Sequence, residues 1–124
     1  MEQKYLDSFG KKYIKHNFDS VLEFYVGKLS GESPNPLYRN IADLYLSLSK
    51  EQQDVLRNYI EKIIGTLNHD FLSFFEENTD YKIVARKENG DLIDLRKLSE
   101  KSSAGMLHGE LFTWISEYSK YKTE

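Results

Sequence analysis

The sequence predicts a mainly helical α+β fold: a helical bundle around one long central helix at about residues 49–77, followed by a β-hairpin at about 81–95 and a C-terminal helix. Three observations support this prediction: an apolar stripe of helical period, an Asn-Gly pair between two strand-like segments, and a final amphipathic stretch. With 124 residues, 40% of them hydrophobic, the chain fits a single domain, 1–124, that can bury a core.

The central helix has a marked start and a continuous apolar stripe. Ser49 followed three residues later by Gln52 forms a capping-box pattern. At about 100° per residue, its apolar side chains fall on one stripe, which we expect to be buried against the bundle. The stripe consists of Leu56, Ile60, Ile63, Leu67, Phe71 and Phe74, with Tyr59, Ile64 and Phe75 at its edges. The prediction depends on burial of this stripe and on a helix that continues through Gly65.

Two shorter helices are expected in the first 30 residues. Residues 2–15 indicate a helix broken around Gly10, and Asp19 can cap a second helix over 20–29.

Another helix should follow the loop at 30–36. Asn35 can cap it and Pro36 suits its first position, where a missing N–H costs nothing. Its apolar face runs directly into the central helix, so we expect the two to form an antiparallel helical hairpin.

After the central helix the period changes. Residues 81–87 have strand composition, Asn89-Gly90 suits a type I′ turn, and residues 92–95 can return as the second strand. Residues 96–105 are polar and predict a loop. The closing helix is indicated by apolar residues at helical spacing, namely Leu107, Leu111, Trp114, Ile115 and Tyr118.

Composition excludes several classes of function. The chain has no cysteine, which rules out disulfides and thiolate chemistry, and with no apolar signal segment at the N-terminus we expect a cytoplasmic location. Residues 31–80 carry four bases against nine acids, and no basic stripe occurs, so nucleic acid is not an expected partner. No run of 18 apolar residues predicts a membrane span.

Only weak candidates for catalysis occur, namely Asp70, His108 and Glu110. Asp70 falls at the edge of the apolar stripe, where a carboxylate either accepts hydrogen bonds from a tyrosine, Trp114 or loop amides, or acts as a general base with a raised pKa. With His108 and Glu110 it would define a small enzyme or ligand-binding protein with a pocket between the central helix and the C-terminal segment. No metal-binding or cofactor motif is present, so neither is expected.

The preferred hypothesis is a non-enzymatic protein-binding module. Seventeen aromatic residues, nine of them Tyr, are more than a core of this size readily encloses, and Tyr is common at interfaces. Acidic residues of the middle segment could steer a basic partner. Taken singly, each acid also fits a solvated helix face. The predicted binding residues are Asp43, Glu51, Asp54, Glu61, Tyr118 and Tyr121.

Two segments are similar to segments of other proteins: residues 107–121, LHGELFTWISEYSKY, and residues 69–77, HDFLSFFEE. The chain resembles small uncharacterised bacterial proteins with a helical body, a hairpin and a GEL, WI and YSK ending. The resemblance implies that fold and a bacterial source, and it assigns no catalytic residue. In size, acidity and architecture the chain is also similar to immunity proteins that neutralise toxins, which implies a protein partner of unknown identity.

Overall fold

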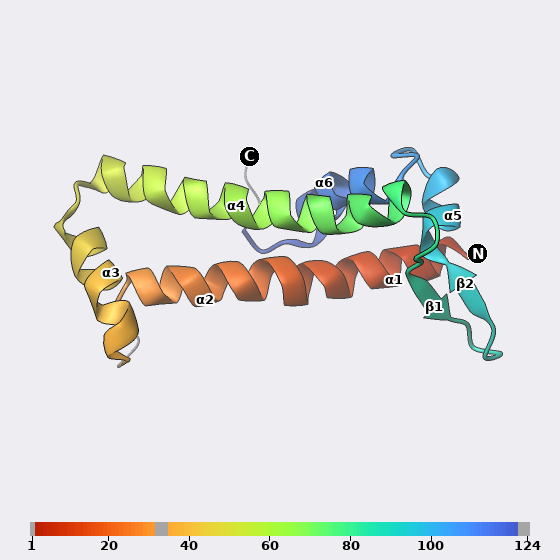
Figure 1. Ribbon diagram of the computed structural model, residues 1–124, viewed down its shortest axis with the longest axis horizontal. Coiled ribbons are helices and arrows are strands. Elements are labelled where there is room, and N and C mark those ends of the chain that lie inside the picture. Colours follow the sequence, from red (N-terminus) through yellow and green to blue (C-terminus); the bar gives the residue numbers. More distant parts are fainter. Residues whose placement is uncertain (1, 32–34, 122–124) are drawn as a thin grey trace.

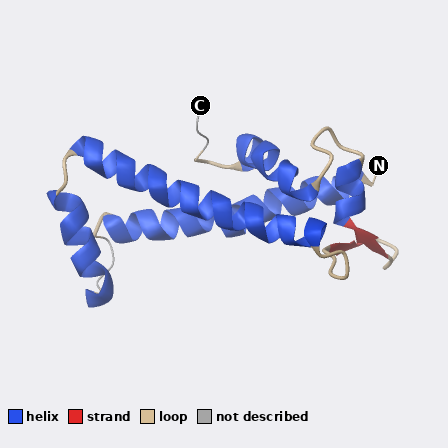
Figure 2. Cartoon of the chain, turned by 45° about the horizontal axis from the view of Figure 1, so that its top comes forward, coloured by secondary structure: helices blue, strands red, loops and turns tan. Residues whose placement is uncertain are grey.

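The chain folds into two long helical rods that run side by side (Figure 1). The computed structural model describes residues 2–31 and 35–121. A crosswise helix joins the rods at one end, whereas the hairpin and the last two helices gather around the other end (Figures 1 and 2). The predicted α+β, mainly α fold with one long helix is confirmed. The first rod comprises α1 (Gln3–Tyr13), the π-helix η1 (Ile14–Asp19) and α2 (Ser20–Leu29), and the other elements are α3 (Pro36–Ser47), α4 (Lys50–Glu77), β1 (Val84–Arg86), β2 (Leu92–Asp94), α5 (Leu95–Glu100) and α6 (Leu107–Tyr118).

The predicted starts of α3 and α4 are confirmed. Asn35 accepts a hydrogen bond from the Leu37 backbone at 3.0 Å, and Pro36 occupies the first position of α3. At the start of α4, Ser49 and Gln52 form the complete capping box. Since each cap satisfies amides that the first helical turn leaves unpaired, these short motifs locate the starts reliably.

The prediction of which face of α4 is buried is wrong. Leu67, Phe71 and Phe74 are 64%, 51% and 42% exposed, whereas the buried residues of α4 are Ile64, Asn68 and Leu72. One position along a helix turns about 100°, so the buried face lies next to the predicted stripe. The helix itself is continuous through Gly65, as expected.

Asn68 explains why the buried face was not recognised. Its side chain accepts a hydrogen bond from the Tyr13 hydroxyl at 2.7 Å and donates to the carbonyl of Asn17, in η1, at 3.1 Å. It also donates to the Ile64 carbonyl at 2.8 Å. These partners allow an amide to be buried between the two rods, where periodicity alone assigns an apolar residue.

The first rod is continuous, so the predicted break at Gly10 is wrong. Gly10 is buried against α6, and a Cβ at this position would lie 2.5 Å from the Trp114 indole. Asp19 does not cap α2, because the helix continues through it and its side chain makes no capping bond. The rod instead contains a π-helical turn, a rare distortion that sequence patterns do not predict.

The crosswise helix α3 does not form the expected helical hairpin with α4. It lies across the end of the rods and packs on α2 (Figure 1), with the ring centroids of Phe24 and Tyr38 6.1 Å apart. A hydrogen bond joins α3 and α4, because the Gln53 side chain donates to the Tyr45 carbonyl at 2.9 Å.

The β-hairpin is confirmed, with shorter strands and a different turn. Lys87 N donates to Asp91 O at 2.7 Å, Gly90 N donates to Lys87 O at 2.9 Å, and of the turn residues Gly90 alone has a positive φ, +92°. The loop is therefore a type I turn followed by a glycine bulge, not the expected type I′ turn. The segment predicted as a loop at 96–105 begins with the short helix α5, which Asp94 caps.

The core lies at the hairpin end of the rods, where α1, η1, α4, α5 and α6 meet. Trp114 of α6 is its largest fully buried side chain, and its ring contacts Phe9 and Tyr13 of α1. The joining end near α3 contributes little to this core, since the buried cluster contains no residue of α3. Burial of α6 between α1 and α4 thus fixes the relative position of the two rods.

Candidate functional site

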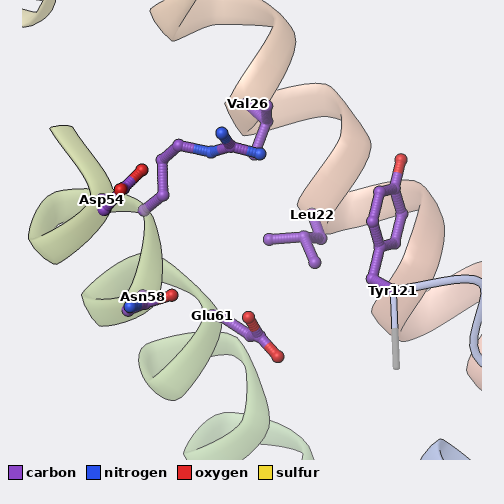
Figure 3. Close-up of a pocket in the computed structure, with 7 residues that line it drawn as sticks. Leu22, Val26, Asp54, Asn58, Glu61 and Tyr121 are labelled. Carbon is purple, nitrogen blue, oxygen red and sulfur yellow. The ribbon is translucent and has the colours of Figure 1, made fainter. Parts of the chain in front are cut away.

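A hollow of about 400 Å³ lies between α2 and α4, where the C-terminal segment that follows α6 crosses the first rod (Figure 3). Apolar side chains come from α2 and polar side chains from α4, and Tyr121 closes one side (Figure 3). The lining residues are Leu22, Val26, Asp54, Arg57, Asn58, Glu61 and Tyr121.

A second hollow, of about 440 Å³, meets the first at Asn58 and Glu61. It lies between α4, η1 and α6, and it is mostly apolar. Its other lining residues are Phe18, Lys62, Gly65, Phe112 and Ile115. We call the two hollows together the α4 groove.

The wall made by the C-terminal segment is held by Asp19. Ser119 Oγ donates to Asp19 Oδ1 at 2.6 Å, and the Lys120 backbone amide donates to Asp19 Oδ2 at 3.1 Å. Asp19 and Ser119 are both buried. Lys120 Nζ also lies 2.9 Å from Glu23 at the surface, which raises the pKa of that ammonium group mainly through the hydrogen bond with Glu23. A buried charge-assisted contact of this kind positions Tyr121 at the groove.

Glu61 is the most available acceptor in the groove. It is half-buried, and within residues 2–31 and 35–121 its carboxylate makes no hydrogen bond or ion pair. Asp54, by contrast, is paired with Lys50 at 3.1 Å. Arg57 and Lys62 are exposed, so their charges are well hydrated. A carboxylate flanked by Leu22 and without a partner gains most from a cationic hydrogen-bond donor.

Three of the predicted binding residues, Asp54, Glu61 and Tyr121, come together in this groove. Asp43, on α3, and Glu51, in the first turn of α4, are exposed and do not line it.

Tyr118 is half-buried at the end of α6 and also does not line the groove. Burial, followed by the nearby Asp7 and Glu117 carboxylates, raises the pKa of its hydroxyl. Its carboxylate neighbours distinguish it from Tyr121, which lines the groove.

Among the described residues, no hydrogen bond or ion pair joins any two of the three catalytic candidates. Asp70 is exposed and its nearest ionisable partner is His69, with Nδ1 3.3 Å away. Glu110 is buried and accepts a hydrogen bond from Ser102 Oγ in the loop before α6. The His108 ring packs edge-on against His69, with centroids 4.9 Å apart, and its buried Nδ1 has no partner among the described residues.

Sequence reasoning missed the apolar wall and the polar neighbours of Glu61. One signal was present: Asp54 lies three and four residues before Arg57 and Asn58, and Glu61 lies four and three residues after them, which places all four on one polar face of the helix. The partners of this face, Leu22 and Val26, lie about 30 residues away in the sequence and carry no local signal.

Comparison of the chain with models of protein families, with curated proteins and with solved structures finds no match. Among the described residues, no three His, Asp or Glu side chains are grouped so that they could hold a metal ion. In the ranges 2–31 and 35–121, every helix is either too short or too polar to cross a membrane.

Proposed function

We propose that this protein is a non-enzymatic protein-binding module whose α4 groove receives a basic, partly apolar segment of a partner. The observation that carries the proposal is Glu61, a half-buried carboxylate that has no ion pair within the described chain and lies where two hollows meet. A lysine or arginine of the partner would supply its missing donor, and the partner's neighbouring apolar side chains would contact Leu22, Phe112 and Ile115.

The acidic middle of the chain supports the same proposal. Asp43 and Glu51 are exposed outside the groove, and negative charge near a binding site accelerates the approach of a basic partner. Binding of a basic toxin domain by a bacterial immunity or antitoxin-type protein of the cytoplasm is the biological role that we propose for this arrangement. The direct contact would be made in the groove, and the outer acids would act at longer range.

The alternative function, a small enzyme or ligand-binding protein built on Asp70, His108 and Glu110, stays a prediction. The three side chains face different surroundings, and none of them lines either hollow of the α4 groove.

The proposal is tested by titrating the ¹⁵N-labelled protein with a helical peptide of leucine and lysine, and with a matched peptide in which glutamate replaces each lysine. We expect the lysine peptide alone to shift amide resonances of residues 54–65, and Glu61→Gln to weaken its binding about tenfold, since a hydrogen bond to a charged group contributes about 1.5–3 kcal/mol. Raising the salt from about 0.1 M to 1 M should weaken binding to the wild type.

Glu77→Gln is the matched control, because it removes one exposed acid of the same helix outside the groove. It should leave peptide affinity within about twofold. Equal binding of both peptides, or equal effects of the two glutamine variants, would contradict the proposed site.

A further inference from the structure

Four residues that the periodicity placed in the core, together with Val55 and Tyr59, form a long exposed apolar stripe on α4. Val55, Tyr59, Ile63, Leu67, Phe71 and Phe74 are each at least 42% exposed. Consecutive members lie four or three residues apart, so they form one continuous surface along the helix. We call this surface the α4 stripe.

The middle of the α4 stripe faces away from the α4 groove, because Ile63 follows Glu61 by two positions and is turned about 200° around the helix. At the start of α4 the two surfaces adjoin, since Val55 and Tyr59 line a small hollow together with Asn58 and Lys62, which also line the groove. The stripe from Ile63 to Phe74 is therefore the part that needs its own occupant.

The stripe is large for an isolated monomer. With about 150–250 Å² for a fully exposed aromatic residue, the exposed fractions of Tyr59, Phe71 and Phe74 correspond to roughly 230–390 Å², and Val55, Ile63 and Leu67 add further apolar area. The largest apolar patch of a typical monomer covers about 300–600 Å², whereas a stable interface buries about 800 Å² on each partner. Tyr81, 61% exposed, extends the patch, because its ring packs on Phe74 with centroids 5.7 Å apart.

The stripe is also complementary to itself. Its residues are distributed about a midpoint near Gly65, so a two-fold axis there would place Ile63 opposite Leu67 of the partner subunit and Tyr59 opposite Phe71 of the partner subunit. No charged residue interrupts the stripe, and therefore no like charges would meet across the axis. Lys62 and Asp70, which are exposed on the flank, have opposite charges at similar distances from this midpoint.

From these observations we infer that a second copy of this chain covers the α4 stripe and forms an antiparallel homodimer about a two-fold axis near Gly65. The inference goes beyond the proposed function, because it uses the opposite face of α4. Each subunit of the dimer keeps its own groove open to a different partner.

The dimer is tested by sedimentation velocity of the full chain between about 1 and 300 µM, a range that covers micromolar dissociation constants. We expect a concentration-dependent dimer for the wild type, a monomer for Leu67→Glu, and an unchanged dimer for Leu37→Glu. Leu37 is the matched control because it is a 75% exposed leucine of α3 outside the stripe. A wild-type monomer at every concentration, or equal effects of both variants, would overturn the inference.

A second measurement does not depend on a disruptive substitution. Since the chain has no cysteine, single cysteines report the arrangement directly. In the antiparallel dimer the two copies of position 63 are about 6 Å apart along the axis, and those of position 55 about 30 Å, at about 1.5 Å per residue. A short thiol-reactive cross-linker should thus join Ile63→Cys and leave Val55→Cys monomeric, because the axial offset and the separation of the helices together reach the limit of about 7 Å between Cα atoms for a direct disulfide. Cross-linking of both would indicate a parallel pair and overturn the two-fold arrangement, and cross-linking of neither would overturn the dimer. Peptide binding in the α4 groove is measured separately, so failure of one proposal does not imply failure of the other.

Discussion

Glycine has opposite roles at two positions of the long helices. Gly10 allows Trp114 to approach the backbone of α1, and a Cβ there would lie 2.5 Å from the indole. Gly65 lies in the middle of α4, and a Cβ there would meet nothing within 4 Å. The first glycine is required by packing, whereas the second only lowers the helix propensity of α4.

We predict that Gly10→Ala lowers the free energy of unfolding by about 1–3 kcal/mol, because the new methyl group overpacks a well-filled core. Gly65→Ala should raise it by about 0.5–1 kcal/mol, the difference in helix propensity. Urea denaturation of the two variants measures both values. Changes of the same sign would contradict the packing of α1 on Trp114.

Asn68 is the polar residue on which the contact between the rods depends. Its substitution by leucine leaves the Tyr13 hydroxyl and the Asn17 carbonyl without their side-chain partner. We predict a loss of about 1–3 kcal/mol for Asn68→Leu, the cost of leaving the buried Tyr13 hydroxyl without its partner. Asn40→Leu on the exposed face of α3 is the control and should change stability by at most about 0.5 kcal/mol. Equal losses in urea denaturation would argue against the buried hydrogen bonds.

Tyr13 makes stability depend on alkaline pH. Burial raises the pKa of its hydroxyl from 10.0 to about 12. Because the folded state holds this proton more tightly, its contribution is fully present below pH 10 and is lost as the pH rises towards 12. We predict that the wild type loses up to about 1.4 kcal/mol per pH unit in this window relative to Tyr13→Phe. A difference between the two proteins that stays constant from pH 9 to about 12 would contradict burial of this hydroxyl.

At the scale of elements, the sequence predicted where helices begin better than which face they bury. Ser49 with Gln52, and Asn35 with Pro36, act within a few residues, so their effect is visible locally. The buried face of α4 depends instead on Asn68, whose partners lie more than 50 residues away. The α4 stripe is more hydrophobic than the face that is buried, and periodicity therefore favoured the wrong face.

The candidate site was predictable in part for the same reason. Asp54 and Glu61 stood out as acids on one helix, and Tyr121 as a terminal aromatic residue. Their meeting with α2 depends on the anchoring of the C-terminal segment by Asp19. This long-range contact has no sequence signature, and the position of Asp19 just before a helical segment suggested a helix cap instead.

We predict that Asp19→Ala releases the C-terminal segment. The substitution leaves the Ser119 hydroxyl and the Lys120 amide without their acceptor, and it should accelerate hydrogen exchange at Lys120 by about tenfold or more, with a loss of about 1–3 kcal/mol in global stability. Glu23→Ala, which removes only the surface ion pair with Lys120, should change stability by less than about 1 kcal/mol. Unchanged exchange in Asp19→Ala would contradict this anchor.

At the scale of the whole molecule, α4 separates two surfaces. One side of the helix lines the α4 groove together with α2 and α6, and the other side presents the α4 stripe. In our account the groove binds a basic partner and the stripe binds a second copy. Both proposals rest on the same orientation of α4 about its axis, in which Ile64, Asn68 and Leu72 are buried.

This orientation of α4 is tested most directly by comparing Leu72→Ala with Leu67→Ala in urea denaturation. The protein concentration should be about 1 µM, where the proposed dimer is least populated. Leu72 is 0% exposed and Leu67 is 64% exposed, although both are leucines of the same helix. The account predicts a loss of about 2–5 kcal/mol for Leu72→Ala and of at most about 0.5 kcal/mol for Leu67→Ala. A loss for Leu67→Ala as large as that for Leu72→Ala would show that the stripe is buried in the monomer and would contradict the account.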